Sequence, residues 1–102
     1  LSMTFDSCQL NLSCFYQLDL KDTLFKNCSI QEVDFTASNL TNATFDDCDL
    51  VGAIFEQTIL VKADFRTAIN YAFDPELNRI KGAKFSKFGV IGLLGKYGII
   101  VE

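Results

Sequence analysis

The chain carries a large apolar residue at every fifth position from residue 5 to residue 65. Phenylalanine alternates with leucine or isoleucine at these positions, which we call centres. The centres are Phe5, Leu10, Phe15, Leu20, Phe25, Ile30, Phe35, Leu40, Phe45, Leu50, Phe55, Leu60 and Phe65. A half-buried β-strand repeats every two residues and an α-helix about every 3.6, so neither element alone produces a period of five.

The residue two positions before each centre is mostly Cys, Ser, Thr or Ala, with larger side chains at Met3, Leu18 and Val33. Residues two apart in an extended chain point to the same face, so this residue and its centre are both expected in the core. The two residues after each centre are often Asp, Asn, Ser or Gly, which tolerate tight turns. Each five-residue unit is therefore predicted to form one short strand and one corner.

A second, longer period gives the number of corners in each coil. Cysteine recurs at Cys8, Cys28 and Cys48, and the charges at positions 6, 26, 46 and 66 alternate in sign, as stacked neighbours favour. Each of these intervals contains four units, which also fits the alternation of Phe with Leu or Ile. The pattern predicts an all-β solenoid with four sides, whose coils pair like parallel strands around a filled core without a pocket.

The predicted core consists of ladders that run from coil to coil. They are Phe5, Phe25, Phe45, Phe65 and Phe85 on the first side, Leu10, Ile30 and Leu50 on the second, Phe15, Phe35 and Phe55 on the third, Leu20, Leu40, Leu60 and Ile80 on the fourth, and Cys8, Cys28 and Cys48 beside them. At 102 residues with 49% apolar content, one domain can bury such a core.

The repeat is interrupted at Asn70 and Pro75, where centres are due, and its register returns at Ile80. The predicted parts are coils over residues 1–69, an irregular loop over 70–79, and a last partial coil with a helix or strand cap over 80–102. Because the repeat is already in register at Leu1, we expect the C-terminal part of a longer solenoid or an excised domain.

After the last partial coil, Ser86 can cap a short helix that Gly98 would end. Three glycines inside this segment disfavour a helix, which should therefore form only by docking. Its apolar stripe is predicted to cover the last coil and to contact a second copy of the chain. The stripe consists of Val90, Ile91, Leu93, Leu94 and Tyr97, of which Val90, Ile91, Leu94 and Tyr97 are the candidates for the cap and the dimer contact.

Composition argues against catalysis, metal binding and a membrane span. The chain has no histidine, and stacked cysteines do not converge on a tetrahedral zinc site. We therefore expect no enzyme activity, cofactor or metal, and cysteines that pack the core in a reducing cytoplasm, with Cys14 alone pointing outward. The apolar tail is shorter than the roughly 20 residues that a membrane helix needs and contains Lys96.

The pentads SNLTN, CDLVG and ADFRT resemble the pentapeptide-repeat family, whose consensus is A(D/N)LXX. The resemblance implies a right-handed quadrilateral β-helix, here of about four coils, followed by a short C-terminal helix. The ending IKGAKFSKFGVIGLLGKYGIIVE resembles that of the Qnr-type quinolone-resistance relatives, in which a helix after the last coil serves dimerisation. This second resemblance implies a homodimer.

Charge and resemblance together suggest a protein partner. Residues 1–70 carry a net charge of −6 and residues 71–102 a net charge of +2, so direct nucleic-acid binding is disfavoured. Qnr-type relatives act as DNA mimics on type II topoisomerase, which implies DNA gyrase or topoisomerase IV as the partner here. The candidate acidic surface is Glu32, Asp34, Asp46, Asp47, Asp49 and Glu56.

The alternative is a structural or protein-interaction scaffold unrelated to topoisomerase. The predicted outward charge is spread over three of the four sides, whereas a DNA mimic would concentrate it on adjacent sides. Apolar residues at outward positions of the third coil, namely Val51, Ile54, Ile59 and Val61, can mark a contact surface. The same residues can equally be strand formers at corners with no role in binding.

Overall fold

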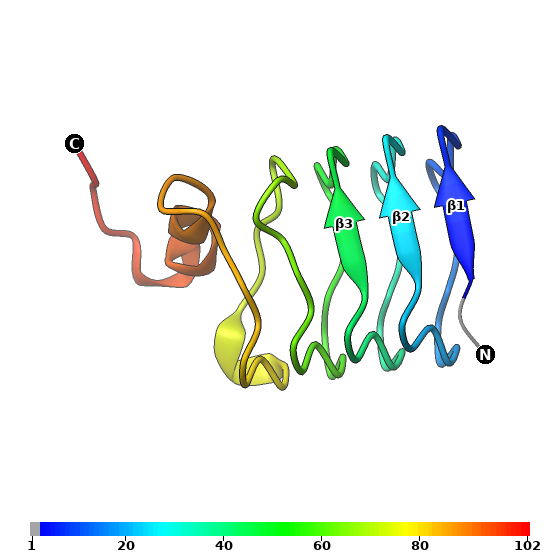
Figure 1. The fold of residues 1–102 in the computed structure, drawn as a ribbon. Helices are drawn as coiled ribbons and strands as arrows, with labels where there is room; N and C mark the ends of the chain where they lie inside the picture. The colour runs from blue at the N-terminus through cyan, green and yellow to red at the C-terminus, as the bar shows by residue number, and fades with distance from the viewer. Residues whose placement is uncertain (1–2) are drawn as a thin grey trace.

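The computed structural model describes residues 3–102 as a rod of stacked four-sided coils that measures 39 × 23 × 23 Å (Figure 1). Its parallel sheet contains β1 (Thr4–Asp6), β2 (Leu24–Lys26) and β3 (Thr44–Asp46) in that order. Phe25 pairs with Phe5 in the coil before it and with Phe45 in the coil after it. The predicted four-sided β-helix is confirmed, and the expected start of the repeat at residues 1 and 2 lies outside the described residues.

The other three sides are held by single parallel bridges with the same offset of one coil, from Gln9↔Ser29 to Asp64↔Lys84. In most units, two N–H groups donate to the following coil, as Leu10 does to the Ser29 carbonyl (2.8 Å) and Leu12 to the Gln31 carbonyl (2.9 Å). A third N–H, that of Ser29, donates back to the Cys8 carbonyl (3.0 Å). Backbone hydrogen bonds therefore tie each inner coil to both of its neighbours.

Nearly every corner depends on one residue with a positive φ angle, the second residue after the centre, with Thr67 as the exception among residues 5–69. Asn and Asp occupy some of these positions, but Leu12, Glu32 and Lys62 adopt the same conformation, with φ of 65°, 54° and 60°. Side chains of these types rarely adopt a left-handed conformation. The ladder bonds on both flanks impose it, so the corners follow the repeat rather than the presence of turn-forming residues.

The core is a continuous stack of aromatic rings flanked by leucine and isoleucine. The Phe45 ring lies 4.9 Å from those of Phe25 and Phe65, with interplanar angles of 2° and 17°. The predicted ladder residues from Leu20 to Phe65 are buried. Those of the end coils are only partly buried, because they have a neighbouring coil on one side: Phe5, Cys8, Leu10, Phe15, Ile80 and Phe85.

The interrupting loop fills the core with different residues from those that the register would supply. Tyr71 and Phe73 are buried near the positions where residues 70 and 75 were due, and the Phe73 ring lies 5.2 Å from that of Phe55. Asp74 then caps the 3₁₀ helix η1 (Pro75–Leu77), whose Glu76 N–H it accepts at 2.9 Å. The chain rejoins the repeat through the bridge between Ile59 and Arg79.

The tail forms two 3₁₀ helices, η2 (Gly89–Leu93) and η3 (Gly95–Tyr97), so the prediction of one helix with a continuous apolar stripe was wrong. The physical reason is close docking, because a Cβ on Gly92 would overlap the Tyr71 carbonyl oxygen. The Ser86 hydroxyl accepts the Gly89 N–H (2.9 Å), and Gly98 ends η3 with φ of 62°.

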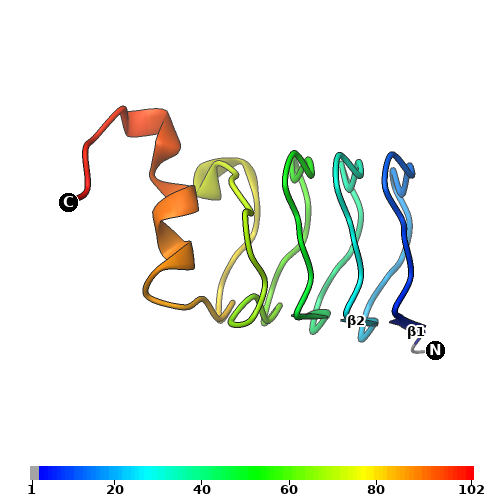
Figure 2. The same ribbon diagram turned by 90° about the horizontal axis from the view of Figure 1, so that it is seen from above.

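Docking buries only one residue of the predicted stripe, Leu93. Leu94 is half-buried, and the remaining stripe residues face solvent with exposed fractions of 37% to 55%: Val90, Ile91 and Tyr97. Figure 2 shows the tail standing at the end of the solenoid, beyond the last coil. The four residues proposed for a cap therefore contribute little to capping, and the dimer contact that they were assigned stays a prediction.

Candidate functional site

The candidate acidic residues do not form one patch. Asp46, Asp47 and Asp49 lie at one corner of the third coil, where a surface hollow of about 550 Å³ is lined by Asp47 and Asp49 together with Asn27. The other three candidates occupy the next corner and the third side: Glu32, Asp34 and Glu56. The structure thus brings three of the six acids together and leaves the rest elsewhere on the coils.

The corner acids are fixed by hydrogen bonds from neighbouring coils. Asp49 accepts the side-chain amides of Asn70 (3.1 Å) and Gln31 (3.0 Å), and the bond from Asn70 is the main cause of its lowered pKa. The Thr67 hydroxyl donates to Asp46 (2.9 Å) and accepts the Asp47 N–H (3.0 Å). The lowered pKa keeps the Asp49 carboxylate ionised, which suits charge recognition rather than proton transfer.

Acids directly before a centre have a structural role that the sequence analysis missed. The side-chain oxygen of such a residue accepts the N–H two positions later, as in Asp34 with Thr36 (2.9 Å). The same bond recurs at Asp19, Asp49 and Asp64, at the amide Asn39, and at Asp74 before the missing centre at Pro75. The preference for Asp or Asn at this position of the repeat was the available signal, because these side chains close such turns.

One of these acids is also neutralised by a cation. The Arg66 guanidinium donates to both oxygens of Asp64, with the Nη2 contact at 2.8 Å, and this pairing holds the pKa of Asp64 below its usual range. Lys21 lies 3.9 Å from Asp19. One acid on the first side and one on the fourth side therefore lie beside a base.

The stacked cysteines are hydrogen-bond donors within the core. The Cys28 thiol donates to the Phe5 carbonyl (3.2 Å) and the Cys48 thiol to the Phe25 carbonyl (3.3 Å). Burial raises the pKa of Cys48 to about 12, so its thiolate is absent at neutral pH. Within residues 3–102 no three potential metal ligands gather, and Cys14 is exposed as expected.

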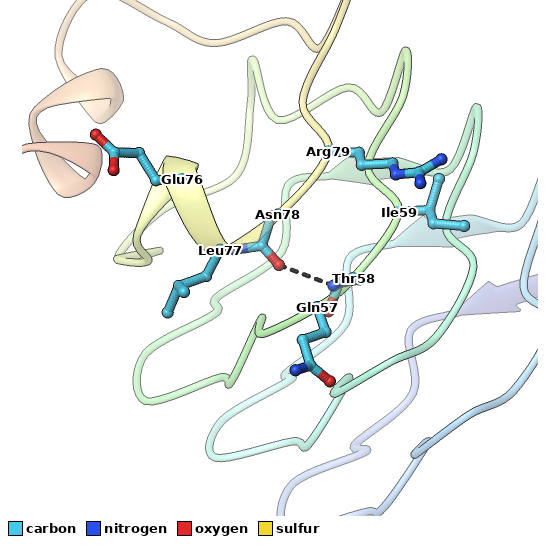
Figure 3. Close-up of a pocket in the computed structure, with 7 residues that line it drawn as sticks. All are labelled: Gln57, Thr58, Ile59, Glu76, Leu77, Asn78 and Arg79. Carbon is cyan, nitrogen blue, oxygen red and sulfur yellow. Dashed lines mark hydrogen bonds between the residues drawn. The ribbon is translucent and has the colours of Figure 1, made fainter.

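A second surface hollow, of about 420 Å³, lies where the loop rejoins the repeat (Figure 3). Asn78 fills the gap in the backbone ladder, because its side chain accepts the Thr58 N–H (3.0 Å) and donates to the Phe55 carbonyl (2.8 Å). Figure 3 shows Glu76 and Arg79 pointing in opposite directions. The hollow therefore lacks a convergent pair of charged groups.

Apolar side chains are exposed on the second and third sides of the later coils. Val51 and Ile54 have exposed fractions of 44% and 43%, whereas Ile59 and Val61 are half-buried. The sequence analysis did not predict the exposure of Ile69 and Leu77 in the later coils. No helix in the described part of the chain combines the length and apolar character needed to cross a bilayer.

A family model described as the pentapeptide repeat region matches residues 2–72. No curated protein matches the sequence significantly. Solved structures with similar folds include a trypsin-treated form of QnrB1, named as a plasmid-mediated fluoroquinolone resistance protein. It is 18% identical, with 97% of this chain and 67% of that chain covered and a TM-score of 0.49.

Two further structural relatives are cyanobacterial. The pentapeptide repeat protein Rfr23 from Cyanothece 51142 is 21% identical, with 82% of this chain and 60% of that chain covered and a TM-score of 0.37. HetL from a Nostoc strain, named as involved in heterocyst differentiation regulation, is 15% identical, with 81% and 46% covered and a TM-score of 0.32. Since the family model spans more than half of the sequence, this chain belongs to the pentapeptide-repeat family.

Proposed function

We propose that the protein is a non-enzymatic scaffold that binds another protein through the outer faces of its coils. The observation that carries this proposal is the filled core, in which rings stack at 4.9 Å and the central phenylalanines are fully buried. The cavities described above are surface hollows without convergent acid and base groups. The outward side chains are what remains for recognition, and they include both fixed carboxylates and exposed apolar residues.

The more specific proposal is that the scaffold mimics DNA towards a type II topoisomerase, DNA gyrase or topoisomerase IV. The rod is 23 Å across in both short directions, close to the width of a B-DNA duplex. Hydrogen bonds hold Asp49 and Asp46 in place and lower the pKa of Asp49, so the corner presents fixed charge, as a phosphate backbone does. Direct binding to nucleic acid is not part of the proposal, because the coils are acidic.

The second candidate is an interaction scaffold unrelated to topoisomerase. It is favoured by the dispersal of the acidic candidates over several sides and by the pairing of Asp64 with Arg66. It is also favoured by the exposed apolar residues Val51, Ile54 and Ile69, which a mimic of DNA does not need.

Inhibition of gyrase supercoiling, measured at two salt concentrations, separates the two candidates. A mimic should compete with DNA, and its inhibition should weaken steeply as salt rises, because both interactions depend on paired charges. Replacing the corner acids by asparagine keeps their hydrogen-bonding shape and removes the charge. The test variant carries Asp46→Asn, Asp47→Asn and Asp49→Asn, and the matched control carries Asp6→Asn, Asp19→Asn and Asp22→Asn.

The expected result is a clear loss of inhibition in the test variant and a smaller loss in the control. Equal losses of inhibition in the two variants would show that inhibition depends only on the net charge of the protein and not on the corner acids. Absence of inhibition by the unmodified protein at tens of micromolar would reject topoisomerase as the partner and leave the scaffold proposal standing.

A further inference from the structure

The C-terminal end of the rod carries the opposite charge from the coils. Residues 1–70 have a net charge of −6, whereas residues 79–102 contain five bases and one acid and have a net charge of +4. Lys96 is held in salt bridges with Asp74 (3.0 Å) and Glu76 (3.3 Å). The other four bases are exposed, and within residues 3–102 none of them forms a salt bridge: Arg79, Lys81, Lys84 and Lys87.

The same end exposes large apolar side chains that have no role in the fold. Phe88 is 90% exposed and Ile100 is 84% exposed, the two highest exposed fractions among the large apolar residues in the described part of the chain. Neither belongs to the apolar stripe that the sequence predicted. Apolar exposure of this extent, next to unpaired bases, indicates a contact with a partner.

These residues belong to one apolar surface around η2. Phe88 immediately precedes η2, and side chains three apart share a face in a 3₁₀ helix, so Phe88 lies above Ile91. A hollow of about 130 Å³ then joins η2 to the end of the chain and is lined by Ile91, Leu94, Ile99 and Val101. Figures 1 and 2 both show the segment after η3 on the far side of η2 from the coils. The apolar surface therefore faces away from the solenoid.

The combination of charge and apolar surface favours a membrane that contains anionic lipids. Such a membrane presents negative headgroups directly above hydrocarbon, so it can accept bases and apolar side chains from the same end of a protein. A nucleic acid would pair with the bases and leave the aliphatic residues 99–101 in water. The acidic coils are repelled by an anionic surface, which would orient the rod with its C-terminal end towards the membrane.

We propose that the C-terminal end of the rod binds peripherally to membranes that contain anionic lipids. Phe88 and Ile100 insert between the headgroups, and Lys84 and Lys87 lie beside the lipid phosphates and carboxylates. This mode of binding requires no helix that crosses the bilayer, and the described residues contain none. It does not depend on what the coils bind, and it leaves their outer faces free for a protein partner.

Cosedimentation of the full chain with unilamellar vesicles gives the first test. Vesicles with about one third phosphatidylserine should bind the protein and vesicles of phosphatidylcholine alone should not, because each base near an anionic surface strengthens binding about fivefold. Binding should weaken as salt rises. The double variant Lys84→Gln, Lys87→Gln should bind roughly tenfold to thirtyfold more weakly.

The matched control carries Lys21→Gln and Lys26→Gln, which remove two exposed bases from the first coils. It should bind the vesicles nearly as well as the unmodified protein. Absence of binding to phosphatidylserine vesicles, or equal losses in the two double variants, would overturn the proposal.

A tryptophan in place of Phe88 tests insertion, because the chain has no tryptophan of its own. The emission of Phe88→Trp should shift to shorter wavelength on anionic vesicles and should be quenched by lipids with brominated acyl chains. Leu12→Trp, at an exposed position of the first coil, is the matched control and should show neither change. A shift at Leu12→Trp without one at Phe88→Trp would contradict the proposed orientation and refute the proposal.

Ile100→Ser distinguishes a lipid surface from other partners, because it removes an apolar side chain and leaves the charge unchanged. It should weaken vesicle binding severalfold. Equally tight binding of vesicles and of a DNA duplex, neither affected by Ile100→Ser, would show recognition of phosphate alone and overturn the lipid proposal. Sedimentation that shows a dimer in which Phe88→Trp is shielded from both water and vesicles would also overturn it.

Discussion

Replacement of Phe45, in the middle of the aromatic stack, by alanine should strongly destabilise the protein. Phe45 has no exposed surface and is sandwiched between the rings of Phe25 and Phe65, both at 4.9 Å. It also meets Phe35 and Phe55 edge-on, with centroids 5.9 and 6.2 Å away. Phe45→Ala therefore removes four aromatic contacts and leaves a cavity that rigid coils cannot close.

The expected cost is at the upper end of the range of about 3 to 5 kcal/mol for a buried phenylalanine. Ring pairs add about 0.5 to 1.5 kcal/mol each beyond their buried area, which favours the upper end. Urea unfolding followed by far-ultraviolet circular dichroism measures this cost. With a slope of about 2 kcal/mol/M, the midpoint should fall by about 2 M. Asp47→Asn, at an exposed corner, is the control and should shift it little.

The end coils provide an internal comparison. Phe5 and Phe85 belong to the same ladder but are partly buried, and each stacks against one ring of that ladder, at 5.2 and 5.4 Å. Their alanine variants should cost roughly half as much as Phe45→Ala, since less area and fewer ring contacts are lost. Equal costs along the ladder, or a cost for Phe45→Ala as small as that of the corner control, would refute the reasoning from stacking.

Two matched comparisons and one pH dependence test other parts of the structure. Thr23→Val should stabilise the protein by about 1 kcal/mol, because the buried Thr23 hydroxyl has no hydrogen-bond partner. Thr58→Val should destabilise the protein by about 1 kcal/mol, because the Thr58 hydroxyl donates to a buried carbonyl at 2.9 Å. Thermal unfolding measures both changes in stability. Gly92→Ala should release the tail to limited proteolysis, whereas Gly95→Ala, with open space at its Cβ, should not. The pKa of Asp64 is lowered in the folded state, so its stabilisation is present at neutral pH and is lost as pH falls below about 4; Asp64→Asn should flatten the acid limb of stability against pH.

The solenoid could be predicted from the sequence because its geometry is repeated in every unit. An apolar residue at every fifth position and a cysteine in every fourth unit leave few other arrangements, and the pairing of Phe25 with the rings one coil away confirmed both periods. The corners were predicted from turn-forming residues, which explain only some of them. Leu12 and Lys62 turn the chain without being turn formers, since the ladders on either side impose their φ angles.

The tail and the loop could not be predicted because their contacts are not periodic. Tyr71 and Phe73 replace centres without keeping the register, so no spacing identifies them as core residues. Gly89 and Gly92 were interpreted as weak helix positions, whereas each admits a close approach of Tyr71 that a side chain would block. Such a contact depends on the position of a loop that is distant in the sequence, so the local sequence does not predict it.

The acidic residues show why charge counts alone say little about function in this fold. A carboxylate directly before a centre closes a turn through the N–H two residues on, and asparagine does the same at Asn39. Charge at these positions is therefore not required by the fold, because the neutral amide serves as well. Asp46 and Asp47 differ, since they lie after a centre, and Asp47 uses its backbone N–H for the bond to Thr67. The fold does not explain the charge of an acid whose carboxylate closes no turn. Substitutions of Asp46 and Asp47 therefore test recognition of charge more directly than the total number of acids does.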